Sequence, residues 1–293
     1  MWTSINAVTA LIAGLTVSAA PSLDNTSGVD IPPVPAFSDD AEVRGREIAD
    51  YVDLFDRGWI DEVSRGRMTL FDAGGDSVER TYSRMILEHA TEGDKSIVRF
   101  LTPAEIKGVA ALTHENPGSS DDNWLYLPAN KRVRRISGAN KTASFQGTEF
   151  TYEDLSNFEV QEYDWRFLDE VTMEENGTDM PLLRVEARPN YENTGYSKLV
   201  VYIHAEHWRR ERIDFYDKAG QLLKTQDFAA WVHHHGRFWR ADEVTVENHQ
   251  TGKRTRLEQE KLYLNLGLYT SSRTGKARPN LDDSQFTTQA LQL

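Results

Sequence analysis

The feature that most constrains the fold is a strict alternation of side chains in the second half of the chain. In residues 196–205, every second side chain falls on the same side of an extended backbone. Residues 212–216 alternate again and end in Asp217-Lys218-Ala219-Gly220, a sequence typical of a tight hairpin turn. Residues 222–232 then run back from that turn. Short alternating segments joined by such turns predict an antiparallel meander.

Other runs predict further strands, and one stretch predicts a helix. Strands are expected at residues 78–88, 97–101, 109–113, 124–127, 133–137, 182–187, 244–247 and 256–264. A helix is expected over residues 40–57, because steps of three and four connect Ala41, Gly45, Ile48, Val52 and Phe55. Asp39, with Glu42, can cap its start, and Gly58 can end it. This mixture predicts an α+β fold class that is mainly antiparallel β.

The composition allows a large core and excludes several kinds of function. The chain has 293 residues, of which 39% are hydrophobic, and this is enough for one large domain or two small ones. A formal net charge of −13 argues against a nucleic-acid-binding protein. The sequence contains no cysteine, which excludes disulfides, thiolate zinc sites, cysteine nucleophiles and lipid attachment to an N-terminal cysteine.

The two ends of the chain differ from the middle. Residues 1–20 carry no charged side chain, and residues 7–17 form an apolar run as long as a signal-peptide core. We expect a signal peptide that is cut after Ala19, because Val17-Ser18-Ala19 fits a cleavage site and the run is shorter than the ~20 residues that cross a bilayer. Residues 20–37 are expected to form a linker. Residues 271–293 are expected to form a polar, loosely attached tail that docks through Phe286.

The residue types that carry catalysis do not form a recognisable pattern. His204 and His207 are expected on opposite faces of a strand, which argues against a metal site, as does the alternation within residues 233–235. Ser77 lies in a glycine-rich turn, and the chain has no serine-nucleophile elbow and no phosphate-binding glycine loop. Adjacent carboxylates are expected to be solvated. The sequence therefore predicts no catalytic residue, no metal and no cofactor.

The densest positive charge lies between two apolar segments. Residues 131–141, named here the basic block, contain Lys131, Arg132, Arg134, Arg135 and Lys141 and no acidic residue. An aromatic-aliphatic run precedes the block, and aromatic residues follow it. One interpretation is an edge strand that charge protects from aggregation. The other is the rim of an apolar cavity, where arginine meets an anionic headgroup. The residues alone favour neither.

A longer pattern around the basic block resembles a known family. Residues 124–155, named here the signature segment, contain Trp124-Leu125-Tyr126-Leu127-Pro128, Arg132-Val133-Arg134-Arg135-Ile136, Lys141, Ser144-Phe145-Gln146-Gly147-Thr148-Glu149-Phe150 and Tyr152-Glu153-Asp154-Leu155. Together with residues 100–108 and 213–225, this pattern resembles the periplasmic proteins described as outer-membrane lipoprotein-sorting proteins, which have a LolA-like fold. The resemblance runs from about residue 43 to residue 286. Glu149 departs from the pattern, because an aspartate is expected there, but the charge is kept.

The resemblance carries its own implications. It implies a LolA/LolB-like half-barrel, an unclosed and strongly curved antiparallel sheet whose concave face is covered by helices. It implies a periplasmic carrier or binding protein for a lipid, a lipoprotein acyl chain or another hydrophobic ligand. Many members occur with transporters of the resistance-nodulation-division (RND) type, so an inner-membrane RND-type transporter is an expected partner, and peripheral membrane contact is possible.

These expectations define candidate residues and two alternatives. We expect the hydrophobic cavity to be lined by Val52, Phe55, Trp124, Tyr126, Leu127, Phe145, Phe150 and Tyr152. The basic block is expected to bind a headgroup or to dock a partner. One alternative is an accessory subunit that carries no ligand and docks to a transporter complex. The other is a lipid hydrolase, which the missing nucleophile motif disfavours.

Overall fold

The computed structural model describes residues 31–89, 91–155, 158–175, 177–265 and 281–292. The expected signal peptide and most of the expected linker lie outside the described residues, so both stay predictions. Residues 31–293 form one compact unit. Within the described residues, no helix combines the length and the apolar character that crossing a membrane requires.

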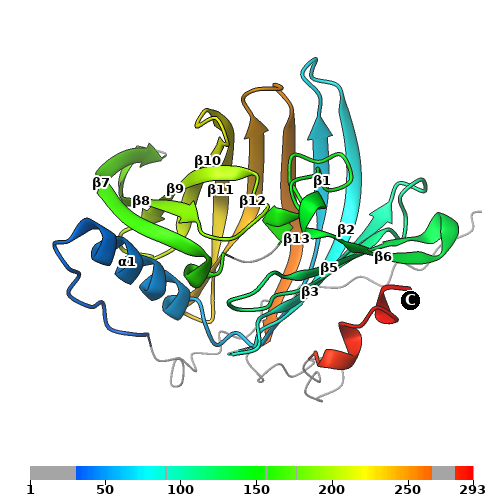
Figure 1. The fold of residues 1–293 in the computed structure, drawn as a ribbon, viewed down its shortest axis with the longest axis horizontal. Helices are drawn as coiled ribbons and strands as arrows, with labels where there is room; N and C mark the ends of the chain where they lie inside the picture. Colours follow the sequence, from blue (N-terminus) through cyan, green and yellow to red (C-terminus); the bar gives the residue numbers. More distant parts are fainter. Residues whose placement is uncertain (1–30, 90, 156–157, 176, 266–280, 293) are drawn as a thin grey trace, which may run out of the picture. The chain divides into compact units, whose positions relative to one another are not determined.

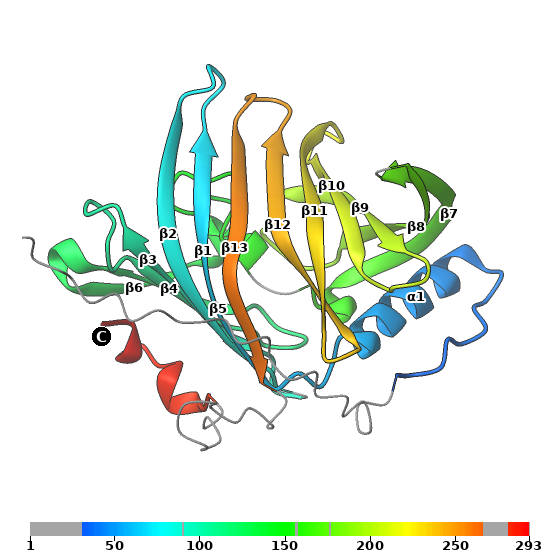
Figure 2. The ribbon, with the colours of Figure 1, turned by 180° about the vertical axis from the view of Figure 1, so that it is seen from behind.

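Thirteen antiparallel strands form one curved sheet that is not closed into a barrel (Figures 1 and 2). The strands run in the spatial order β6-β5-β4-β3-β2-β1-β13-β12-β11-β10-β9-β8-β7, so β6 and β7 are its two edges. Their bounds are β1 Asp61–Phe71, β2 Ser77–Leu87, β3 Lys95–Thr102, β4 Ala110–His114, β5 Asp122–Leu127, β6 Arg132–Ile136, β7 Tyr163–Glu175, β8 Thr178–Pro189, β9 Tyr196–His204, β10 Arg210–Asp217, β11 Leu222–His234, β12 Phe238–Asn248 and β13 Arg254–Asn265. The predicted fold class, mainly antiparallel β with an unclosed curved sheet, is confirmed.

Two meanders meet at one seam in the middle of the sheet. Strands β1 to β6 follow one another in space as they do in sequence, and so do β7 to β13. The seam is the pairing of β1 with β13, in which Asp61 lies opposite Asn265 and Phe71 lies opposite Arg254. The first strand and the last strand of the chain, β1 and β13, are therefore neighbours at the centre of the sheet (Figure 2).

One α-helix covers the concave face at the β7 end. Helix α1 spans Ala41–Phe55, and the side chain of Asp40 accepts a hydrogen bond from the Val43 N–H at 3.0 Å. The N-cap is therefore Asp40 and not Asp39 as the sequence analysis expected. Gly45 faces β7 so closely that an added Cβ would lie 2.6 Å from the backbone carbon of Arg166. Glycine at this position allows the helix to lie directly on the strand.

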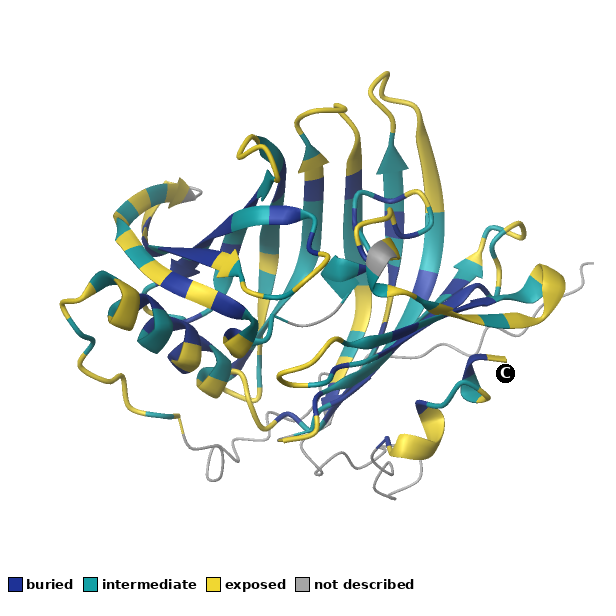
Figure 3. Cartoon of the chain, in the orientation of Figure 1, coloured by how far each residue is buried: buried dark blue, intermediate teal, exposed yellow. Residues whose placement is uncertain are grey.

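The helix belongs to the largest of three apolar clusters. Its buried side chains pack with those of β7 to β10 and with Trp208. A second cluster covers the concave face of β1 to β5, where Phe100, Phe145 and Tyr152 meet. No α-helix in the described part of the chain covers this second region. A loop that contains the short 3-10 helix Glu153–Leu155 covers it instead (Figures 1 and 3).

The third cluster lies on the opposite face of the sheet and includes the C-terminal residues. Leu281, Phe286 and Leu291 are buried against Ile97, Leu112 and other side chains of β2 to β5. The guanidinium of Arg99 donates to the carbonyls of Leu291 and Ala290, at 2.9 and 3.0 Å. Phe286 docks on the sheet as the sequence analysis expected. Loose attachment does not hold for residues 281–292.

Candidate functional site

A cavity of about 590 Å³ opens on the concave side of the sheet, between α1 and the central strands. Val52 and Phe55 of α1 form one wall. The opposite wall comes from β1, β2, β12 and β13. The remaining lining residues lie on β10, β11 and the loops around residues 56–59, 88–94, 117, 158–161 and 207–209. Cavities of this size hold small organic ligands in other proteins, where about 300–1,000 Å³ is usual. This is the candidate functional site.

Aromatic side chains supply much of the apolar lining. The lining aromatics are Phe55, Trp59, Tyr82, Phe158, Trp208, Phe228, Trp231 and Trp239. They hold one another in place: Trp208 meets Tyr51 of α1 edge to face at 4.6 Å, and Phe228 stacks near Trp231 at 6.1 Å. The Arg209 guanidinium lies over the rings of Trp231 and Trp239, at 4.5 and 4.3 Å. Such packed rings give the cavity fixed walls.

The histidines expected on opposite faces lie together. The rings of His204 and His207 are 4.3 Å apart, because β9 ends at His204 and the chain turns immediately after it. The Nδ1 of His204 accepts the backbone N–H of Glu206 at 3.1 Å, and Trp239 lies between His207 and His233. Burial lowers the pKa of His204 to about 4. Among the described residues, no three histidine or carboxylate side chains converge as a metal site requires.

Charged groups line one side of the same cavity, and most of them are paired. Arg240 donates to Asp56 at 2.7 Å and lies 3.4 Å from a Glu62 oxygen. Arg57 forms an ion pair with Asp53. The carboxylate of Glu88 accepts two backbone N–H groups of the loop before β1, those of Gly58 and Ile60. Pairing of this kind lets a concave surface hold charges beside apolar walls without leaving them unsatisfied.

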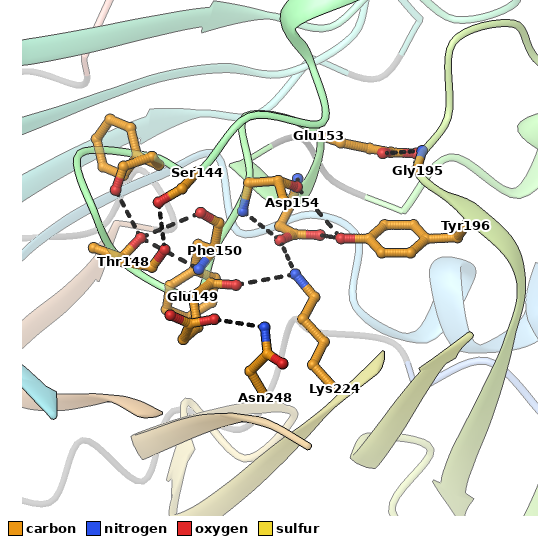
Figure 4. A network of polar contacts seen from close by, with 12 residues as sticks. Ser144, Thr148, Glu149, Phe150, Glu153, Asp154, Gly195, Tyr196, Lys224 and Asn248 are labelled. Atoms are coloured by element: carbon orange, nitrogen blue, oxygen red, sulfur yellow. Dashed lines mark hydrogen bonds and ion pairs between the residues drawn. The ribbon is translucent and has the colours of Figure 1, made fainter. Parts of the chain in front are cut away.

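The loop of residues 143–155, named here the crossing loop, spans the concave face of the sheet and connects its two halves. At one end, Arg80 of β2 donates to the carbonyl of Gln146 at 2.7 Å. In the middle, the Glu149 N–H donates to the Thr255 hydroxyl of β13 at 2.9 Å. Asn248 of β12 donates to the Glu149 side chain at 2.8 Å (Figure 4). The loop therefore touches strands from both meanders.

The far end of the crossing loop is held by a buried ion pair. The Lys224 Nζ on β11 lies 2.5 Å from Asp154 and donates to the carbonyl of Glu149 at 3.1 Å (Figure 4). Tyr196 of β9 donates to the second Asp154 oxygen at 2.7 Å. The carboxylate of Glu153 accepts the Gly195 N–H at 2.9 Å. These contacts give much of the signature segment a structural role, because its polar residues fix the loop to the sheet.

The predicted cavity residues occupy different places. Val52 and Phe55 line the 590 Å³ cavity. Phe145, Phe150 and Tyr152 are buried side chains of the crossing loop itself. Phe145 and Tyr152 pack in the cluster on β1 to β5, and Leu127 packs against that cluster. Tyr126 and Trp124 belong to the cluster that covers the C-terminal residues, on the other face of the sheet. The role of these last six residues in ligand binding stays a prediction, and none of them is among the lining residues of this cavity.

The basic block lies mainly on an edge. Strand β6 is the edge strand, and Lys131, Arg132 and Arg134 are exposed on it or beside it. Arg135 forms an ion pair with Asp122 of β5. Lys141 is buried and lies 4.0 Å from an Asp121 oxygen. The block is therefore split into an exposed edge and one inward-facing lysine, and it lies outside the cavity lining.

Several lining residues were missed by the sequence analysis. Trp239, Trp231 and Arg210 come from strands that were read only as alternating segments. The one signal in the sequence was local: Trp208-Arg209-Arg210 and Phe238-Trp239-Arg240 both place arginine beside tryptophan at the start of a strand. Arginine stacking on an aromatic ring is common at binding surfaces, so this repeated pairing identifies candidates.

The fold defines a class: an unclosed, curved antiparallel sheet with a cavity on its concave face is the LolA-like half-barrel. A solved outer membrane lipoprotein-sorting protein domain from Vibrio parahaemolyticus is 37% identical, with a TM-score of 0.76, over 85% of this chain and 98% of that one. A DUF1329 family protein from Desulfovibrio piger is 27% identical, with a TM-score of 0.75, over 86% of this chain and 99% of that one. The chain belongs to the family of outer-membrane lipoprotein-sorting proteins.

A further solved structure and a family model also match the chain. A LolA superfamily protein from Nitrosomonas europaea is 18% identical over 84% of this chain and 98% of that one, and its TM-score of 0.62 shows that the fold is shared. A family model with the description "-like: Uncharacterized protein" matches residues 92–292. No curated protein matches the chain.

Proposed function

We propose that the protein is a periplasmic carrier that holds a lipid, a lipoprotein acyl chain or another hydrophobic ligand in the cavity between α1 and the central strands. The observation that carries this proposal is the cavity itself, about 590 Å³ in volume and walled by aromatic side chains from strands far apart in the sequence. A folded protein fills its interior to high density, so a space of this size with ordered aromatic walls favours a ligand.

Apolar burial supplies enough free energy for such a task. At ~0.8 kcal/mol per buried methylene, an acyl chain of about sixteen carbons gains roughly 12 kcal/mol before the costs of ordering. The family resemblance supports the same assignment, since the relative from Vibrio parahaemolyticus carries lipoprotein sorting in its description. A carrier needs no catalytic residue, which agrees with the sequence analysis.

The compartment and the partner belong to the same proposal. Export by the expected signal peptide, with cleavage after Ala19, places the carrier in the periplasm. An RND-type transporter of the inner membrane is the partner that hands over or receives the ligand. The exposed arginines and lysine of β6 and its preceding turn form the surface that meets this partner or the membrane.

Native mass spectrometry tests the carrier assignment. The protein is purified from the periplasm without detergent, and its mass is compared before and after organic extraction. A defined additional mass that extraction removes is the expected result. An unliganded mass, combined with no uptake of offered fluorescent fatty acids, contradicts the carrier and leaves the accessory subunit that docks without a ligand.

A further inference from the structure

Among the arginines that line the cavity, Arg210 and Arg84 have side chains without a hydrogen bond or ion pair in the described part of the chain. Arg210, at the start of β10, lines the cavity, and its guanidinium lies over the ring of Phe158 at 5.0 Å. Within the described residues it makes no hydrogen bond and no ion pair. Burial lowers the pKa of Arg210, while the charges of Asp56 and Asp53 oppose that shift. Arg210 is partly exposed to the open cavity, and its guanidinium donors are available to a partner that enters there.

The two carboxylates whose charges act on Arg210, those of Asp56 and Asp53, each have another arginine as partner. Asp56 accepts a hydrogen bond from Arg240 at 2.7 Å. Asp53 is paired with Arg57. Arg209, the neighbour in sequence, is bound to Glu211 at 2.6 Å and covered by two tryptophan rings. Arg210 therefore differs from Arg57, Arg209 and Arg240, whose guanidinium groups have partners within the protein.

A β-bulge points Arg210 into the cavity. In the pairing of β10 with β9, Arg212 lies opposite Tyr202 and Arg210 lies opposite Ile203, so Glu211 is the extra residue. Residues opposite each other share a face of the sheet. Ile203 belongs to the cluster under α1, whereas the Tyr202 hydroxyl donates to Asp214, which accepts from Arg212 on the other face. Without the bulge, simple alternation would place Arg210 on the face of Arg212.

We propose that Arg210 binds the anionic group of the carried ligand, a carboxylate or a phosphate, while the aromatic walls hold its apolar chain. The inference rests on the proposed carrier function and names the ligand class: an amphiphile with one acidic end. Guanidinium fits both anions because its planar donors match two oxygens at once. This assignment places the headgroup site at Arg210 and not at the basic block, which lies outside the cavity lining.

The experiment compares ligands that differ only in their polar end. Binding of hexadecanoate, hexadecyl phosphate and methyl hexadecanoate to the detergent-free, extracted protein is measured by calorimetry or probe displacement at pH 8. We expect at least one of the two anions to bind roughly 30-fold or more tightly than the ester, as for a charge pair that is largely desolvated. Preference for carboxylate or for phosphate identifies the source of the anion.

Variants then assign the preference to one residue. Arg210→Met is expected to lower the affinity for the preferred anion to that of the ester and to leave ester binding unchanged, and Arg210→Lys is expected to keep part of the preference. Arg84→Met is the matched comparison, because Arg84 also lines the cavity and has no hydrogen bond or ion pair among the described residues. Thermal unfolding of each variant confirms that it is folded.

Three outcomes are distinguishable. If the anions bind no better than the ester, the headgroup inference is overturned and the carrier stands. If Arg84→Met and not Arg210→Met removes the preference, the assignment to Arg210 is overturned. If none of the three ligands binds, the proposed function itself fails and the inference falls with it.

Discussion

Lys224 and Asp154 form a buried ion pair, 2.5 Å between Nζ and Oδ2, that ties the crossing loop to β11. Both side chains are almost fully covered, and each has a further partner: Lys224 donates to the Glu149 carbonyl, and Asp154 accepts from Tyr196. The pair connects the first half of the sheet, from which the loop emerges, to the second half. Removing one side chain of the pair leaves the other as an unpaired, buried charge.

Lys224→Met is therefore expected to destabilise the protein strongly. Breaking a buried pair at one side costs about 3–5 kcal/mol, which urea unfolding measures directly. Arg46→Met is the control, because the Arg46–Asp50 pair on α1 is exposed and such pairs contribute about 0–1 kcal/mol. Equal, small losses in both variants would show that the loop is not fixed by Lys224.

Narrowing the cavity is expected to weaken ligand binding without unfolding the protein. Ala241 of β12 lines the cavity, and Ala241→Trp places an indole in it. Displacing two methylenes of an acyl chain removes about 1.6 kcal/mol of burial, roughly tenfold in Kd for a fluorescent fatty acid. Ala219→Trp, in the exposed turn after β10, is the matched control. Unchanged affinity in Ala241→Trp would place the ligand elsewhere, for example near the predicted residues Phe145 and Tyr152.

The C-terminal residues are expected to contribute to stability. Phe286 is 1% exposed and packs on the outer face of β3 to β5. Phe286→Ala is expected to cost about 3 kcal/mol in urea unfolding. Gln292→Ala, at an exposed position next to the buried Leu291, is the control. Wild-type stability of Phe286→Ala would mean that the docked segment adds little to the fold.

Glu162 is expected to make stability depend on pH. Burial, followed by the charge of Asp121, raises the pKa of Glu162 to about 7 from an ordinary 4.5. Between these values the folded state keeps a proton that the unfolded state has released, so this group's contribution falls as pH rises from 4.5 to 7. The side chain in Glu162→Gln is neutral at every pH. The free energy of unfolding of this variant, relative to that of the wild type, is therefore expected to be larger at pH 8 than at pH 5. Urea unfolding at the two pH values checks this, and an equal difference at both would contradict it.

The edge strand β6 is expected to bind an anionic membrane surface. Each basic residue near such a surface contributes about 1 kcal/mol, so Arg132→Glu with Arg134→Glu is expected to weaken binding to anionic vesicles by roughly thirtyfold or more. The control is Arg166→Glu with Arg188→Glu, on exposed positions of β7 and β8 near the other edge. Vesicle sedimentation measures both. Identical losses would indicate that only net charge matters, and no loss would favour an acidic protein partner for β6.

Much of the fold could be predicted because the strands alternate strictly. The segments expected at residues 196–205 and 222–232 match β9 and β11 closely. Two strands, β1 and β7, were not predicted from the sequence. The middle of β1 mixes Arg65 and Arg67 with other residues, and β7 is a charged edge strand whose exposed, polar side chains obscure its alternation. Edge strands carry charge to avoid aggregation, so hydrophobic periodicity is weakest there.

The candidate site was harder to predict, for a physical reason. Aromatic residues of the signature segment were expected to line a cavity; the side chains of Phe145 and Tyr152 pack in the cluster between the crossing loop and the sheet, outside the lining of the 590 Å³ cavity. Alternation tells which face a side chain occupies and not whether another segment covers that face. Arg210 shows the same limit, because one bulge residue changes its face and leaves no mark in the hydrophobic pattern.

The seam between β1 and β13 has a consequence for how the protein is made. Asp61 pairs with Asn265, about two hundred positions later in the chain, so β1 has no second neighbour until β13 has been synthesised. Until then the first meander ends in an open strand edge, the kind of surface that joins other chains. Pairing over such a sequence distance is slow. The long-range pairing of β1 with β13 is therefore the step that closes this edge during folding.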